Sequence, residues 1–77
     1  MIYPTIKQLR YFLSLCEEGH FGRAAELSFI SQSAFSTAIQ DLEAVLDTQL
    51  VDRTNRQVTI TAVGKEVATQ ARLRSEE

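Results

Sequence analysis

Residues 31–43 constrain the fold of this chain most, because two chemically different faces run along them with helical spacing. One face is apolar and is typical of a helix packed on a core: Phe35, Ile39, Leu42 and Leu46. The opposite face is uncharged and polar, and it consists of Ser33, Ser36, Thr37 and Gln40. Short hydrogen-bonding side chains at the start of a helix suit a polar surface such as the major groove of DNA. A solvated Ser-rich face would have the same pattern.

Length and composition limit the chain to one small globular domain. Its 77 residues are 44% hydrophobic and 23% charged, which excludes a disordered polyelectrolyte. No apolar run reaches the length of a membrane span and no secretory signal is present, so we expect no membrane association and a cytoplasmic location. The net charge of −2 argues mildly against nucleic acid, although the local distribution of charge can override the total.

Candidate catalytic and metal-binding residues are few. Cys16 and His20 are the only cysteine and histidine, so the sequence predicts neither a zinc site nor a cofactor. We interpret Cys16 as a small buried hydrophobe rather than a reactive thiol. Asp41 and Glu43 lie on different faces of their helix, and no acid is placed to orient His20 beside a serine. A small enzyme is therefore the least favoured class, and no catalytic residue is predicted.

Periodicity and helix-end signals predict three helices in the first two thirds of the chain. The first runs from residues 4–5 to about Glu18 and ends at Gly19, since glycine adopts the left-handed conformation without strain. Its apolar stripe consists of Ile6, Leu9, Phe12, Leu13 and Cys16. A short second helix spans 22–27, and Ser31 caps a third that ends near residues 46–48. Two short helices joined by a tight turn match the helix-turn-helix pattern.

In the last third of the chain, the spacing of apolar residues changes from helical to alternating. Residues 50–53 and 57–60 read as short strands around a turn, which could pack on the helices as a wing. Thr61 caps a fourth helix with an apolar side that includes Val63, Val67 and Ala71. This side either covers the core or pairs with the same helix of a second subunit. The helix has no termination signal, so we expect a fragment, or a helix that continues into something larger.

Three arginines are candidates for contacts with phosphate. Arg53 and Arg56 flank the predicted hairpin tip, where they could straddle phosphates or enter a minor groove. Alternatively, Arg53 pairs with Asp52 in a solvated turn. Arg23 could hold a phosphate where the second helix crosses the DNA backbone, or it is a plain surface residue.

Several segments, in this order, resemble the N-terminal DNA-binding domain of LysR-type transcriptional regulators. They are residues 9–12, 20–26, 31–32, Ser36, Ile39, 42–43, 50–53 and 61–64. The resemblance implies a mostly α fold, a winged helix-turn-helix with a three-helix core, a two-stranded β-wing and a C-terminal linker helix. It also implies a homodimer through the linker helix, and the apolar side of that helix then makes Val63, Val67 and Ala71 its predicted contacts. Residues 1–61 would form the DNA-binding domain and 62–77 the start of the linker. A small-molecule or redox effector would act only through an effector-binding domain that is absent here.

Site residues follow from the resemblance position by position. Gln32 matches a glutamine that reaches base edges, and Ser36 matches a serine that contacts DNA one turn later. Thr37 occupies a variable position that tends to set sequence preference. Arg53 and Arg56 match wing arginines near the minor groove or the backbone. The predicted partner is double-stranded operator DNA.

Three departures from the family pattern affect this prediction. Ser33 stands where proline is common, which adds a hydroxyl to the predicted DNA-binding set. Gln40 and Asp41 replace positions that are often basic, so phosphate attraction should be weaker. Asp47 stands where glycine usually ends the helix.

Residues 20–26, 53–56 and 70–72 look most similar to the peroxide-sensing branch of the family. The main alternative function is a winged helix that binds protein and not DNA, which the acidic net charge favours slightly.

Overall fold

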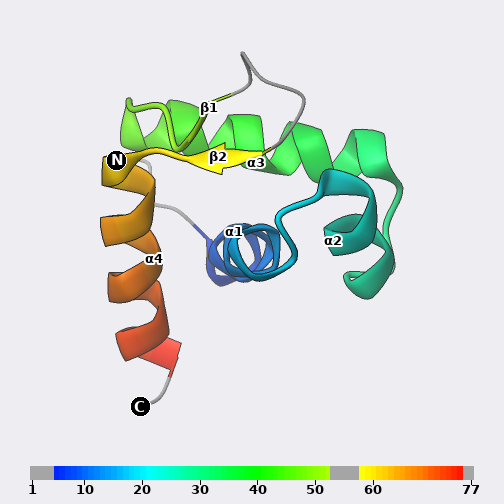
Figure 1. Cartoon of the computed structure of the whole chain (residues 1–77), viewed down its shortest axis with the longest axis horizontal. Coiled ribbons are helices and arrows are strands. Elements are labelled where there is room, and N and C mark those ends of the chain that lie inside the picture. The colour runs from blue at the N-terminus through cyan, green and yellow to red at the C-terminus, as the bar shows by residue number, and fades with distance from the viewer. Residues whose placement is uncertain (1–4, 53–57, 76–77) are drawn as a thin grey trace.

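The computed structural model of the chain describes residues 5–52 and 58–75, which form four helices and one two-stranded hairpin (Figure 1). The elements follow in the order α1 (Ile6–Glu18), α2 (Phe21–Leu27), α3 (Gln32–Leu46), β1 (Val51–Asp52), β2 (Thr59–Ile60) and α4 (Ala62–Ser75). Helix α1 contacts each of the other three helices. This is the mostly helical winged architecture that the sequence predicts.

Side-chain caps set the starts of the first three helices. The Thr5 hydroxyl accepts the Gln8 N–H at 3.0 Å, and the Gln8 side chain accepts the Thr5 N–H at 3.0 Å, which completes a capping box. Ser31 caps α3 as predicted, since its Oγ accepts the Ala34 N–H at 3.2 Å. Helix α2 begins at Phe21, one residue earlier than predicted, because Nδ1 of His20 accepts the Arg23 N–H at 3.3 Å.

The core lies where α1, α2 and α3 meet, with Phe35 at its centre. The Phe35 ring lies 5.5 Å from the ring of Tyr11 and 6.0 Å from that of Phe21, the latter edge-to-face. Ala24 and Ala25 are buried, so the backbone of α2 can approach its neighbours closely. The other buried apolar residues are Phe12, Leu15, Ile39, Leu42, Leu50, Val51, Ala68 and Ala71.

The apolar stripe of α1 differs from the predicted one at two positions. Leu15, which the predicted stripe omits, is fully buried, whereas Ile6 is 71% exposed. At 3.6 residues per turn, Leu15 lies about 60° around the helix from the buried Phe12, and Ile6 about 120°. Spacing by three and four alone therefore placed Ile6 on the wrong face.

The wing is anchored to α3 by one carboxylate. Oε2 of Glu43 accepts the backbone N–H groups of Leu50 at 2.7 Å and of Val51 at 3.3 Å. The two strands then pair antiparallel, with Val51 opposite Ile60 and Asp52 opposite Thr59. Each described strand has two residues, fewer than the predicted segments 50–53 and 57–60, whose inner ends lie outside the described residues.

Helix α4 starts against the base of the wing. Thr61 caps it as predicted: its hydroxyl accepts the Gly64 N–H at 3.0 Å and donates to the Gln49 carbonyl at 2.8 Å. A Cβ atom at Gly64 would lie 2.5 Å from the Leu50 carbonyl oxygen. Gly64 is therefore required because α4 packs closely on the backbone of Leu50, just before β1, a role that the sequence analysis did not predict.

Within the described part of the chain, two turns contain a residue other than glycine with positive φ. Asp47, at the position where the family pattern has glycine, ends α3 with φ 52°. Phe29 follows α2 with φ 60°, and the neighbouring Ile30 N–H donates to the Ala25 carbonyl at 3.1 Å, which closes the helix end. Aspartate tolerates this conformation, whereas it is strained for an aromatic residue. The turn between α2 and α3 therefore contains local backbone strain.

Candidate nucleic-acid interface

The polar face of α3 points away from the core. Gln32, Ser33, Thr37 and Gln40 are exposed and Ser36 is half-buried, while Phe35 on the opposite face is fully buried. The structure thus brings the four α3 residues predicted to contact bases onto one accessible surface. We call Gln32, Ser33, Ser36 and Thr37 the polar stripe.

Hydrogen bonds within α3 determine what the polar stripe can offer a ligand. The Thr37 hydroxyl donates to the Ser33 carbonyl at 3.0 Å, so its lone pairs and its methyl group are what it presents outward. The Ser33 hydroxyl lies 3.4 Å from that of Ser31, which already accepts the Ala34 N–H. In contrast, the amide of Gln32 can both donate and accept.

The start of α2 lies beside the start of α3. A Cβ atom at Gly22 would lie 3.0 Å from Cε1 of His20 and 3.4 Å from Oε1 of Gln32, so these two side chains converge over the glycine. Arg23 is exposed at the same end of α2. The sequence analysis missed His20 as the cap of α2, because histidine is not among the residues that usually cap a helix N-terminus.

Charge is distributed unevenly along α3. The polar stripe is uncharged, whereas the second half of the helix and its C-cap contain Asp41, Glu43 and Asp47. A polyanion would therefore meet less repulsion at the N-terminal half of α3. Arg53 and Arg56, the predicted phosphate contacts of the wing, lie outside the described residues.

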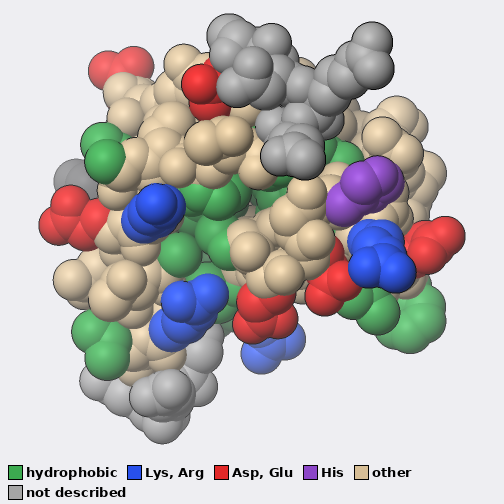
Figure 2. All heavy atoms as spheres, viewed as in Figure 1, with side chains coloured by type: hydrophobic (Ala, Val, Ile, Leu, Met, Phe, Trp, Pro, Cys, Tyr) green, Lys and Arg blue, Asp and Glu red, His purple; other side chains and the backbone are tan. Residues whose placement is uncertain are grey.

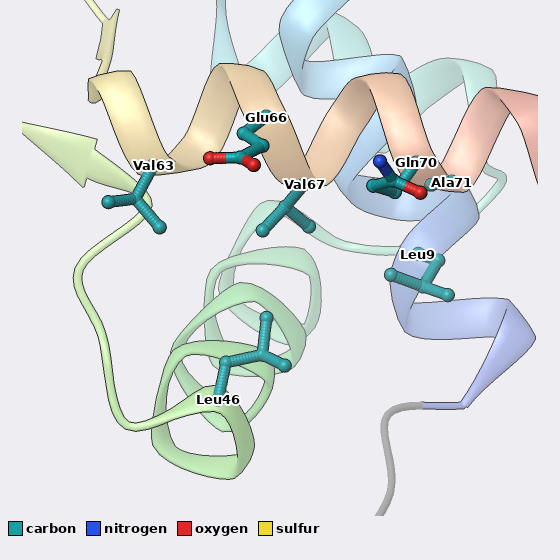
Figure 3. A pocket seen from close by; sticks show the side chains of 7 residues that line it. All are labelled: Leu9, Leu46, Val63, Glu66, Val67, Gln70 and Ala71. Atoms are coloured by element: carbon teal, nitrogen blue, oxygen red, sulfur yellow. The ribbon is translucent and has the colours of Figure 1, made fainter.

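A groove of about 340 Å³ lies between α1, the end of α3 and α4 (Figure 3). In Figure 3, Val63 and Val67 project from α4 toward Leu46, and Leu9 lies across from them on α1. The other lining residues are Glu66, Gln70 and Ala71. Val63 is 46% exposed, whereas Ala71 is only 4% exposed and contributes mainly to the core of its own chain.

Cys16 is half-buried on α1 and packs against the core, so it is less buried than the sequence analysis predicted. Burial raises the pKa of its thiol; nearby Arg72 lowers that pKa and Glu17 raises it further. The thiol is therefore less ionised near neutral pH than a free cysteine, which argues against a role as a nucleophile. Within residues 5–52 and 58–75, no helix is long and apolar enough to cross a membrane.

Comparison with known proteins agrees with this geometry. The model of the family described as "Bacterial regulatory helix-turn-helix protein, lysR family" matches residues 6–65. The chain belongs to the LysR family. This LysR-type domain is 51% identical, over 67 residues, to the SDS degradation transcriptional activation protein of a Pseudomonas strain. That alignment covers 87% of the chain and 22% of the relative. The description of the family is that of bacterial regulatory proteins.

Solved structures of LysR-type proteins have the same fold. The structure of Vibrio fischeri DarR in complex with DNA superposes with a TM-score of 0.92 and 35% identity, covering 97% of this chain and 26% of DarR. The DNA-binding domain of BenM in complex with a catB site superposes with a TM-score of 0.88 and 37% identity, covering 94% of this chain and 78% of that one. The chain is therefore a LysR-type winged helix-turn-helix DNA-binding domain.

The peroxide-sensing branch is represented among the relatives. The probable hydrogen peroxide-inducible genes activator of Mycobacterium leprae is 40% identical over 68 residues, which cover 88% of this chain and 22% of that protein. The Pseudomonas activator is more similar, at 51%. The chain spans less than a quarter of the length of both relatives.

Proposed function

We propose that this chain is the operator-binding part of a transcriptional regulator, and that the polar stripe of α3 enters the major groove and reads base edges. The observation that carries the proposal is the exposure of this uncharged stripe on a helix whose other face is buried. The DNA complexes of DarR and BenM, which have the same fold, support it. Hydrogen-bonding and apolar contacts in the major groove distinguish all four base pairs.

Each residue of the stripe has a chemistry suited to a different contact. The Gln32 amide can make two hydrogen bonds to the major-groove edge of one adenine, because its carbonyl can accept from N6 while its N–H donates to N7. The hydroxyls of Ser33 and Ser36 can donate or accept. Thr37 has its proton engaged by the Ser33 carbonyl, so it would accept from a base amino group or pack its methyl group on that of thymine.

Phosphate contacts would position the domain without reading sequence. Arg23 is exposed beside the N-terminal end of α3, which suits a phosphate at the edge of the groove. Arg53 and Arg56 remain proposed contacts to backbone or minor groove. Each arginine that binds a phosphate releases counterions, so affinity should fall steeply with salt.

We further propose that the chain acts as a homodimer through α4, with residues 62–77 as the start of a linker helix. The groove between α1, α3 and α4 leaves Val63 and Val67 available to a second copy. Leu73 on the same helix is 55% exposed. Ala71 would act by its small size, since it lets another helix approach. A dimer would place two copies of α3 on successive turns of one DNA face.

The test is selection of bound duplexes from a random pool, followed by measurement of Kd for wild type and variants. Two-fold-related half-sites are expected, with a steep negative slope of log K against log salt. Gln32→Ala should reduce the sequence preference at one base position, whereas Arg23→Ala should weaken binding to all sequences alike.

Thr37→Ala and Thr69→Ala form a matched pair, because each threonine is exposed and donates to the carbonyl four residues earlier. Only Thr37→Ala should change the selected sequence. If both variants selected the same sequence as wild type, base reading by the polar stripe would be contradicted. A chain that binds no duplex at all would instead favour the protein-binding alternative.

A further inference from the structure

His20 has a ring nitrogen that the fold does not use. Its Nδ1 accepts the backbone N–H of Arg23 at 3.3 Å and so caps α2. A neutral imidazole carries a single proton, and an accepting Nδ1 places that proton on Nε2. No described residue accepts a hydrogen bond from this Nε2–H. The cap thus fixes both the orientation of the ring and the tautomer.

The imidazole lies at the surface, close to the polar stripe. His20 is exposed, and in Figure 2 the purple imidazole is on the visible face next to a basic side chain. Its Cε1 atom and Oε1 of Gln32 both lie within 3.4 Å of the position that a Gly22 Cβ would occupy. A donor held there is next to the first residue of α3. A helix that precedes a recognition helix crosses the phosphate backbone at the groove edge.

We propose that Nε2–H of His20 donates a hydrogen bond to a phosphate oxygen of DNA, and so fixes how the start of α3 sits in the groove. This inference rests on the proposed function. His20 acts here as a neutral donor and as a positioning residue. Unlike an arginine, it adds no charge, so its contact releases no counterion of its own.

Two substitutions separate the capping nitrogen from the donating one. His20→Asn keeps a side-chain acceptor near the backbone, where asparagine is a favoured N-cap, but has no donor at the reach of Nε2. His20→Gln places an amide N–H near the position of Nε2, but glutamine caps the start of α2 poorly. Both are compared with wild type at one fixed pH of about 8, on the selected duplex and on a random one.

For His20→Asn we expect an unfolding free energy near that of wild type, and a Kd raised about ten-fold or more on both duplexes, as for loss of one hydrogen bond to a charged group. The slope of log K against log salt should stay unchanged. For His20→Gln we expect a lower unfolding free energy, with Kd closer to wild type than that of His20→Asn.

Three results would overturn the inference while leaving DNA binding intact. They are wild-type affinity in His20→Asn, a loss confined to one base position, and a loss accompanied by a shallower salt slope. The second would mean a base contact and the third a cationic contact. Failure of wild type to bind either duplex would overturn the proposed function itself, and this inference with it.

Discussion

Replacing Glu43 with alanine should destabilise the domain more than any other single change to an acidic side chain among the described residues. Its carboxylate accepts the N–H groups of Leu50 and Val51, which are both fully buried. Removal leaves two backbone donors without this partner at the point where the wing joins α3. A buried donor left unpaired costs about 1–3 kcal/mol, and the 3.3 Å bond is the weaker of the two. The expected loss in unfolding free energy is therefore about 3 kcal/mol.

Urea unfolding followed by far-ultraviolet circular dichroism measures this loss, at one fixed protein concentration because a dimer would link stability to concentration. In a domain of this size, 1 kcal/mol corresponds to about 4–8 °C in Tm, so Glu43→Ala should melt at least about 12 °C lower. Both bonds use the same oxygen, so Glu43→Gln can keep them as neutral hydrogen bonds, which are about half as strong, and should lose about half as much free energy. Asp41→Ala removes an exposed carboxylate from the same helix and should stay within about 0.5 kcal/mol of wild type. If Glu43→Ala and Asp41→Ala were equally stable, the anchoring role of Glu43 would be refuted.

Three further predictions concern single positions. Gly64→Ala should lower the unfolding free energy by about 2 kcal/mol or more, because the new methyl group would meet the Leu50 carbonyl oxygen at 2.5 Å; wild-type stability would show that α4 does not pack this closely. Phe29→Asn should raise stability by about 0.5–1 kcal/mol in the same urea assay, since the side chain is 95% exposed and asparagine tolerates positive φ; a loss would mean that the phenyl ring makes a stabilising contact. Cys16 should react with iodoacetamide more slowly than free cysteine at pH 8, because its raised pKa leaves less thiolate, and unfolding in urea should remove the difference; fast reaction in the folded chain would contradict that protection.

The elements that could be predicted from sequence are those specified by local signals. Ser31 and Thr61 cap helices through neighbours three residues away, and Gly19 takes the left-handed conformation at the end of α1. The periodicity of α3 gave both its buried face and its exposed stripe. Asp47 departs from the family pattern, but it adopts the same left-handed turn that a glycine would.

The features that were missed depend on segments that meet only in the folded chain. Glu43 binds the backbone of Leu50 and Val51 after the turn that follows α3, and Gly64 is needed because α4 passes close to the Leu50 carbonyl. Neither contact can be predicted from the spacing of residues along the sequence. His20 was considered as a catalytic or metal-binding group and excluded, so its role as a cap went unnoticed.

The most direct test of the account is an NMR titration of the ¹⁵N-labelled chain with its selected duplex. We predict that the largest amide shifts occur at the polar stripe, Gln32, Ser33, Ser36 and Thr37, and at the start of α2, while the exposed Thr69 on α4 stays unchanged. Shifts concentrated on α4 or on the acidic end of α3, with the polar stripe unperturbed, would contradict the claim that this stripe enters the groove.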